Sequence, residues 1–166
     1  METPASRKLL TLVILQQPSR ILLGMKKRGL GVGRWNGFGG KVEQGEAIEE
    51  AAKREVMEES GIKVTDLEKA GVVTFEFEDD TASAEAHIFR SCNFTGEPLE
   101  TDEMKPQWFD ENSLPLEQMW TSDTYWIPLL LAGKKFKASF WYDRSSTADY
   151  ASRIIKSEIE EVESLN

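Results

Sequence analysis

Runs of apolar residues along the chain predict a protein with many strands. Leu9 to Leu15 is almost wholly apolar and includes Thr, Val and Ile, which is typical of a buried strand. Pro18 and Ser19 predict a turn, after which Ile21 to Lys26 returns as a second strand. Later segments share this character, and we expect strands at Val72 to Glu78, Ala84 to Phe94, Gln107 to Phe109 and Phe136 to Tyr142. The last of these alternates aromatic with smaller side chains, as an outer strand would.

Two segments have helical character. Glu46 to Ser60 begins with acidic residues and is followed by Gly61, which is a natural C-terminal stop. Tyr125 to Leu131 predicts a short helix, in which Pro128 is compatible only with a place near the helix start. Strands mixed with two or so helices predict an α/β or α+β fold, which we expect to form a single domain over residues 1–166.

The segment after Asp143 fits more than one interpretation. Its apolar residues can form one stripe of a helix or belong to an edge strand, and they are Ile154, Ile155, Ile159 and Val162. The many glutamates among them indicate a loose acidic tail from about residue 156. The sequence leaves these alternatives open.

Three glutamates of the first predicted helix continue its apolar stripe. Residues at spacings of three and four are Ile48, Ala51, Ala52, Glu55, Glu58, Glu59 and Ile62. Carboxylates that face inward side by side repel one another and lose hydration, and Arg54 is the one obvious basic neighbour on the helix. A hard divalent cation, Mg²⁺ or Mn²⁺, relieves both effects. The pattern therefore predicts a metal site.

An acidic amphipathic helix with a solvated face is the alternative to a metal site. The segment just upstream favours the metal, because Trp35 to Gly40 contains three glycines and two aromatic residues. Such glycines permit unusual backbone angles and the close approach of a ligand. A loop that faces a ligand, followed by carboxylates that hold a metal, suits the hydrolysis of a diphosphate linkage, in which a carboxylate activates water.

The composition of the chain argues against some classes of binding partner. Asp and Glu number 29 against 20 Lys and Arg, and the net charge of −9 argues against broad binding to nucleic acid or to an anionic membrane. Cys92 is the single cysteine, so no internal disulfide forms, and we expect it to be a small buried hydrophobe in a reducing compartment. His87 is the only histidine and is expected to be structural. We expect a monomer in the cytoplasm, with the nucleus and mitochondria as further places open to it.

The chain resembles the Nudix family in its glycine loop and first helix. All nine defined positions of the Nudix box, G-x5-E-x7-R-E-U-x-E-E-x-G-U with U apolar, are matched by Gly40, Glu46, Arg54, Glu55, Val56, Glu58, Glu59, Gly61 and Ile62. The resemblance implies an α/β/α sandwich around a mixed sheet, and Mg²⁺-dependent hydrolysis of nucleoside diphosphates linked to another group. It implies metal ligation by Glu58, Glu59 and the carbonyl of Gly39. Glu55 and Glu103 resemble a further ligand or the general base. Glu46 and Arg54 resemble an ion pair that fixes the loop against the helix.

Segments outside the box resemble the animal branch of this family that hydrolyses oxidised purine nucleoside triphosphates. They include residues 22–28, 33–42, 75–77, 102–104, 108–109 and 125–131. The resemblance implies that 8-oxo-dGTP or 2-hydroxy-dATP is cut to the monophosphate and pyrophosphate. The substrate contacts it implies are Thr11, Lys26, Asn36, Phe38, Gly39, Gly40, Lys41, Phe75, Phe77, Met104, Trp120, Ser122, Asp123 and Trp126. That branch carries Trp-Pro-Asp-Asp where this chain has Trp120-Thr121-Ser122-Asp123, so a hydroxyl replaces one acid near the base.

Two other functions remain open from the sequence. A Nudix enzyme can act on ADP-ribose, a dinucleoside polyphosphate or capped RNA, although the aromatic residues of the predicted pocket favour a purine triphosphate. A nucleotide sensor without activity is the second, and the intact box argues against it.

Overall fold

A computed structural model describes residues 7–29, 31–78, 80–144 and 153–165, and the side chains of these residues except 80–82. The strands are β1 (Arg7–Gln17), β2 (Arg20–Lys26), β3 (Trp35–Asn36), β4 (Lys63–Phe77), β5 (Asp80–Thr95), β6 (Met104–Asp110), β7 (Lys135–Tyr142) and β8 (Ile154–Val162). The α-helices are α1 (Ile48–Ser60) and α2 (Asp123–Leu131), and a short 3-10 helix covers Leu116–Gln118. No helix in the described part of the chain is long and apolar enough to cross a membrane.

The strands form one mixed sheet. Its order is β3-β2-β1-β5-β4-β7-β8, and β6 adds to β2. The pairs β1–β5 and β4–β7 are parallel, while β1–β2, β4–β5 and β7–β8 are antiparallel. The predicted mixed sheet with two helices is confirmed.

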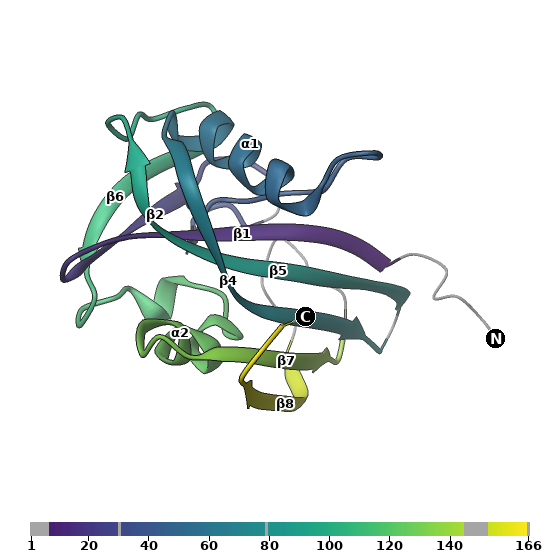
Figure 1. Ribbon diagram of the computed structural model, residues 1–166. Helices are drawn as coiled ribbons and strands as arrows, with labels where there is room; N and C mark the ends of the chain where they lie inside the picture. Colours follow the sequence, from purple (N-terminus) through teal and green to yellow (C-terminus); the bar gives the residue numbers. More distant parts are fainter. Residues whose placement is uncertain (1–6, 30, 79, 145–152, 166) are drawn as a thin grey trace.

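The two helices lie on opposite faces of the sheet (Figure 1). On the α1 side, Ala52 and Val56 pack with Val13 and Leu15 of β1. On the α2 side, Trp126, Ile127 and Leu130 pack with Phe136 and Phe140 of β7. Successive residues of a strand face opposite sides of its sheet, so one strand serves both layers. Two separate apolar cores result, and the sheet separates them.

The glycine-rich segment before α1 runs along β1. The amide of Thr11 donates to the carbonyl of Gly40 (2.8 Å), and that of Val13 donates to Phe38 (2.7 Å). A Cβ on Gly39 would lie 1.8 Å from the Thr11 carbonyl oxygen, which no side chain tolerates. These glycines have no positive φ. Close packing against β1, and not an unusual backbone angle, is therefore what requires glycine here.

Several sequence expectations hold and others are wrong. The predicted strands and both helices are present, and Gly61 ends α1 with a φ of 75°. The strand predicted to be outer is internal, because β7 pairs with β4 on one side and β8 on the other. Pro128 lies inside α2 and not near its start. Cys92 is exposed and not buried.

Of the alternatives left open for the C-terminal segment, the edge strand is confirmed, whereas the helical stripe and the loose tail from residue 156 are wrong. Residues 154–162 form β8, which pairs along β7 from Lys135↔Val162 to Tyr142↔Ile154. Side chains of this edge strand are mostly exposed, so a surface with many glutamates is compatible with it. Backbone hydrogen bonds, which composition does not reveal, hold the segment in place.

Candidate functional site

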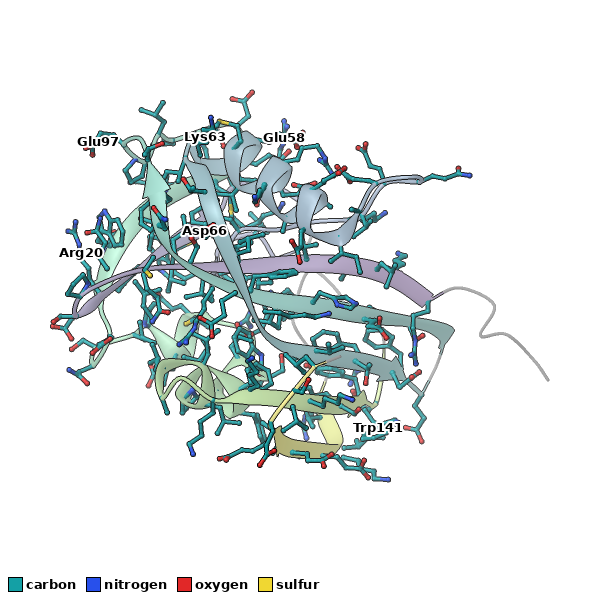
Figure 2. All side chains as sticks on the ribbon, in the orientation of Figure 1. Arg20, Glu58, Lys63, Asp66, Glu97 and Trp141 are labelled. Carbon is teal, nitrogen blue, oxygen red and sulfur yellow. The ribbon has the colours of Figure 1, made fainter. Side chains whose placement is uncertain are left out.

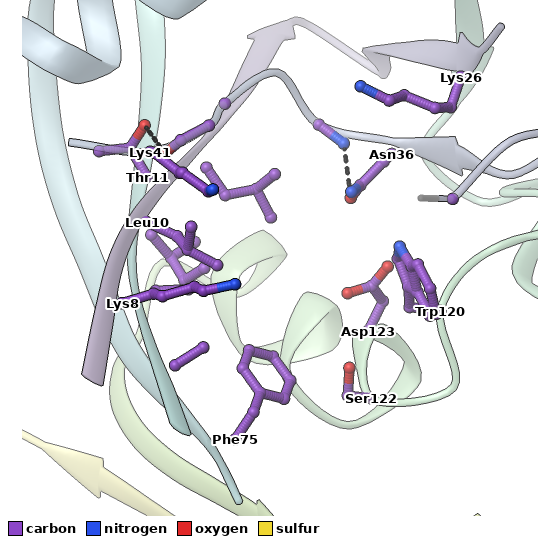
Figure 3. A pocket seen from close by; sticks show the side chains of 18 of the residues that line it. Lys8, Leu10, Thr11, Lys26, Asn36, Lys41, Phe75, Trp120, Ser122 and Asp123 are labelled. Carbon is purple, nitrogen blue, oxygen red and sulfur yellow. Dashed lines mark hydrogen bonds between the residues drawn. The ribbon is translucent and has the colours of Figure 1, made fainter. Parts of the chain in front are cut away.

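A cavity of about 470 Å³ opens between β1, the glycine segment and the start of α2. Its walls are largely apolar and include Leu10, Leu12, Phe75, Phe77 and Trp126. Figure 3 shows Trp120, Ser122 and Asp123 on one side and Leu10, Thr11 and Lys8 on the other. The volume and the aromatic wall suit a flat organic group of drug-like size.

Most of the predicted substrate contacts meet at this cavity. The predicted residues that line it are Thr11, Lys26, Asn36, Gly39, Gly40, Lys41, Phe75, Phe77, Met104, Trp120, Ser122, Asp123 and Trp126. Phe38 is the exception, because it is fully buried in the core on the α1 side. Among the predicted catalytic glutamates, Glu59 reaches the cavity wall.

Glu59 is a buried carboxylate that touches the glycine segment. Its side-chain Oε1 accepts a hydrogen bond from the amide of Gly39 (2.8 Å), and the residue is 5% exposed. Burial raises the pKa of Glu59 to about 7, against the opposing effects of the Gly39 amide and Lys26. A carboxylate with this environment gains from a cation beside it.

Glu55 lies next to Glu59 and packs against Gly40. A Cβ on Gly40 would come within 2.6 Å of the Glu55 carboxyl carbon, so this glycine makes room for the carboxylate. Burial raises the pKa of Glu55, and the hydrogen bond from Arg54 opposes the rise. The two inward glutamates, Glu55 and Glu59, thus share one end of the glycine segment.

Glu58 does not face inward as the stripe predicted. Its side chain is 56% exposed and lies on the solvent side of α1 (Figure 2). Val56 and Ser60, which the predicted stripe omitted, are fully buried. At 100° per residue the buried face is rotated toward these two residues, which leaves Glu58 at its edge.

Arg54 ties the carboxylates of the site together. Its guanidinium is 2.8 Å from Glu46, 3.0 Å from Glu55 and 3.2 Å from Glu58. It also donates to the carbonyl of Lys41 (3.1 Å). The predicted ion pair between Glu46 and Arg54 is confirmed, and Glu46 in turn accepts from the Glu43 amide. The pKa of Glu46 is lowered, chiefly by the hydrogen bond from Arg54. One arginine therefore ties the loop to the helix and partly offsets the negative charge of three acids.

Glu103 is held by basic residues from the other side of the cavity. Its carboxylate is 2.7 Å from Arg28 and 3.1 Å from Lys26. These contacts, led by the Arg28 hydrogen bond, lower the pKa of Glu103. Thr101 links its loop to α1, because the Thr101 hydroxyl donates to the Glu59 carbonyl (3.1 Å) and accepts from the Glu103 amide (3.3 Å).

Two polar side chains, Asn36 and Asp123, line the cavity at the end away from Glu59. Asn36 accepts a hydrogen bond from the Gly37 amide (2.9 Å) through its side-chain oxygen, which fixes the amide's orientation. Asp123 is 4% exposed, and its Oδ2 has no hydrogen-bond partner among the described residues. Burial raises the pKa of Asp123 to about 7, while the Trp120 amide and Arg34 oppose the rise. An unsatisfied buried carboxyl beside a cavity is well suited to bind a ligand donor.

Sequence reasoning missed part of the wall. Lys8, Leu10 and Tyr142 line the cavity but were not predicted to do so. Period-two alternation was the available signal, because Lys8 and Leu10 share a strand face with Leu12. Tyr142 likewise follows Phe140 on the buried face of β7.

No group of three or more Asp, Glu, His or Cys side chains converges on one point within residues 7–29, 31–78, 80–144 and 153–165. The four predicted metal-binding carboxylates instead divide into an inward pair, the buried Glu59 and the half-buried Glu55, and two outer residues, Glu58 and Glu103. The pair supplies oxygen donors, which is the donor type that Mg²⁺ prefers.

Comparisons with known proteins agree with this geometry. Residues 7–130 match the family model of the NUDIX domain. The chain is 51% identical over 158 residues to "Oxidized purine nucleoside triphosphate hydrolase" of Danio rerio, with 95% of this chain and 97% of that protein covered. It is 48% identical to the Mus musculus protein of the same name, with 92% and 99% covered. The solved structure of the MutT protein from Bacillus halodurans superposes with a TM-score of 0.79 at 26% identity, covering 92% of this chain and 97% of that one. The chain belongs to the Nudix family.

Proposed function

We propose that this protein hydrolyses oxidised purine (deoxy)nucleoside triphosphates, such as 8-oxo-dGTP and 2-hydroxy-dATP, to the monophosphate and pyrophosphate. The observation that carries the proposal is one continuous cavity, which joins an aromatic wall and the Asp123 carboxyl at one end to Glu59 and Gly39 at the other. A purine fits the aromatic end, and the phosphates reach the carboxylates. The names of the zebrafish and mouse relatives support the same substrate class.

The base would be held by stacking and by its edge. Phe75, Phe77 and Trp126 provide flat apolar surfaces. Asn36 and the unpartnered oxygen of Asp123 provide hydrogen-bonding groups for the polar edge. Such groups favour a base that satisfies them, because a base that cannot would leave them buried and unpaired.

The residues at the phosphate end fit a divalent metal. Glu59 is a buried oxygen donor and Glu55 a half-buried one, and Gly40 leaves the space that the Glu55 carboxylate fills. We propose Mg²⁺, with Mn²⁺ as a substitute, held by Glu55, Glu58, Glu59, Glu103 and the Gly39 carbonyl. When bound, the metal neutralises phosphate oxygens and lowers the pKa of water. Lys26 and Lys41 line the same end and add positive charge for the phosphates.

The reaction adds water across the linkage between the α and β phosphates. The linkage breaks, one product takes the water oxygen, and the proton passes to a carboxylate. Glu55 and Glu103 are the two candidates for that base. Glu55 is already next to Glu59, whereas Glu103 is bound by Lys26 and Arg28 and would have to leave them. Comparing Glu55→Gln with Glu103→Gln in single-turnover assays separates the candidates.

We also propose a monomer in the cytoplasm: the single cysteine suits a reducing compartment, and the net charge of −9 disfavours self-association. Nuclear and mitochondrial nucleotide pools are part of the same proposal. Purified protein with Mg²⁺ should release pyrophosphate from both oxidised nucleotides faster than from dGTP and dATP, and EDTA should abolish the release. A panel with ADP-ribose, a dinucleoside polyphosphate and capped RNA tests the other Nudix substrates. Faster cleavage of any of these three than of the oxidised nucleotides would contradict the proposal.

A further inference from the structure

The last residue of β7 brings a phenol hydroxyl into the wall of the base cavity. Tyr142 is 8% exposed and lines the cavity. The buried face of β7 is formed by Phe136, Ala138, Phe140 and Tyr142, in strict alternation with less buried residues. The first three of these side chains are wholly apolar. Tyr142 is therefore the point at which this face acquires a hydrogen-bonding group.

Ring packing alone does not require the hydroxyl of Tyr142. Its ring centroid is 5.8 Å from that of Phe77 and 6.2 Å from that of Phe75, and Phe77 is its register partner on β4. A phenylalanine would make the same ring contacts. A hydroxyl that is buried beside aromatic rings is unfavourable unless it is hydrogen-bonded. The hydroxyl therefore needs a partner.

Ser122 and Asp123 surround that hydroxyl with polar groups. The Ser122 side chain is a hydrogen-bond partner of the Tyr142 phenol, and the Asp123 carboxyl is close enough to act on it electrostatically. Burial raises the pKa of Tyr142, so the phenol remains protonated and able to donate. Ser122 is 2% exposed and also lines the cavity.

The hydroxyls of Ser122 and Tyr142 keep hydrogen-bonding capacity for a ligand. Each hydroxyl has one hydrogen to donate and two lone pairs to accept with. One hydrogen bond between Ser122 and Tyr142 uses one donor and one acceptor. One hydroxyl hydrogen and several lone pairs therefore remain for a ligand, next to the unpartnered Oδ2 of Asp123. This end of the cavity can both donate and accept, and of these three side chains Asp123 is the one that can become charged near pH 7.

We infer that Tyr142 is a specificity-determining residue for the purine base and acts as a unit with Ser122. The inference rests on the proposed function and names residues that read the base. Oxidised guanine and oxidised adenine carry different donors and acceptors on the edge away from the sugar: an oxo group and an N–H in one, an amino group and a ring nitrogen in the other. A neutral hydroxyl pair responds differently to these two patterns. Removing one hydroxyl should therefore change the ratio between the two substrates.

The test uses Tyr142→Phe, Ser122→Ala and the double variant, with Tyr125→Phe as the matched control. Tyr125 loses the same hydroxyl, but it is 42% exposed and packs edge-on against Phe140 without lining the cavity. The measurements are kcat/KM for 8-oxo-dGTP and 2-hydroxy-dATP, the thermal midpoint, and the Kd of the two monophosphate products without metal.

Tyr142→Phe is expected to change the ratio of the two kcat/KM values by about three- to tenfold, through KM. Product Kd should shift by the same factor. The double variant should be no worse than the more affected single variant, because both remove one shared hydrogen bond. Tyr125→Phe should leave the ratio within about twofold of the unsubstituted protein, as expected for a residue outside the cavity.

A Tyr142→Phe variant with an unchanged ratio and unchanged product Kd overturns the inference, provided that the unsubstituted protein hydrolyses both oxidised nucleotides. Equal losses on both substrates that accompany a lower thermal midpoint also overturn it, since they indicate a packing role. An unsubstituted protein that is inactive on both nucleotides overturns the proposed function, and the inference with it. The two failures are thus distinguished by the activity of the unsubstituted protein.

Discussion

Asp123 offers the sharpest test of the electrostatics, because its carboxyl is buried without a full set of partners. The residue is 4% exposed, and its Oδ2 has no hydrogen-bond partner among the described residues. Burial raises its pKa from 3.8 to about 7. The perturbation is Asp123→Asn, which keeps the shape and an acceptor for the Trp120 amide but cannot ionise.

The direction of the pH dependence of stability follows from which state, folded or unfolded, holds the Asp123 proton. Between pH 3.8 and about 7 the folded protein keeps the Asp123 proton, whereas the unfolded chain has lost it. Stability from this group is therefore fully present below pH 3.8 and is lost as the pH rises to about 7. The difference of about three pKa units corresponds to at most about 4 kcal/mol at 1.36 kcal/mol per unit. Asp123→Asn removes this pH-dependent loss of stability, because an amide does not ionise.

Urea unfolding of both proteins at several pH values from about 4 to 8 measures the difference. Because Glu59 also has a raised pKa, the difference between the two proteins at each pH isolates Asp123. The variant should match the unsubstituted protein near pH 4 and exceed it by up to about 4 kcal/mol near pH 8. A difference that stays constant across this range would refute the reasoning, since it would show that Asp123 has equal pKa values in the folded and unfolded states.

Three further predictions follow from contacts elsewhere in the molecule. Glu59→Gln can keep the hydrogen bond from Gly39, but it should lower Mg²⁺-dependent pyrophosphate release by at least about a hundredfold. It should also raise the urea midpoint at pH 8, because burial raises the pKa of Glu59 to about 7, and an unchanged turnover would contradict its role. Arg54→Ala should lower the free energy of unfolding by about 2 kcal/mol in urea, because three carboxylates lose their shared counterion. Arg54→Lys should recover only part of that stability. A loss below about 0.5 kcal/mol for Arg54→Ala would argue that the ion-pair cluster does not stabilise the fold. Gly71→Ala would place a Cβ 2.3 Å from the Phe136 ring and should cost about 1–3 kcal/mol in urea unfolding, with a smaller loss when it is introduced into a Phe136→Leu protein.

Local signals were sufficient for most of the elements. Apolar runs bounded by turn residues located most of the strands, and Gly61 with its φ of 75° ended α1 where the sequence placed the stop. The predictions failed where pairing partners decide the outcome. Whether Phe136 to Tyr142 is outer or internal depends on β8, and β8 exists because its backbone pairs with β7. Neither partner is visible in the local pattern.

The candidate site shows the same division. The chemistry of the carboxylate helix was readable because a helix has a fixed angle per residue, and Glu55 and Glu59 do face inward. The exposed position of Glu58 could not be read from the sequence, because Val56 and Ser60, which are fully buried, set the buried face of the helix. Alternation with Phe140 puts Tyr142 on the buried face of β7, but no local pattern places it beside Ser122, which immediately precedes α2.

The sequence by itself determined the strands, the helix of glutamates, the family and the class of bond that such a helix can hydrolyse, because these depend on short-range spacing. The tertiary structure decided which glutamates are buried, why Gly39 must be glycine, and which side chains surround the base cavity. The first two properties depend on how α1 and the glycine segment pack against β1, and the third depends on where β7 and the start of α2 meet. Distances between segments far apart in the chain depend on packing, which the local order of residues does not encode.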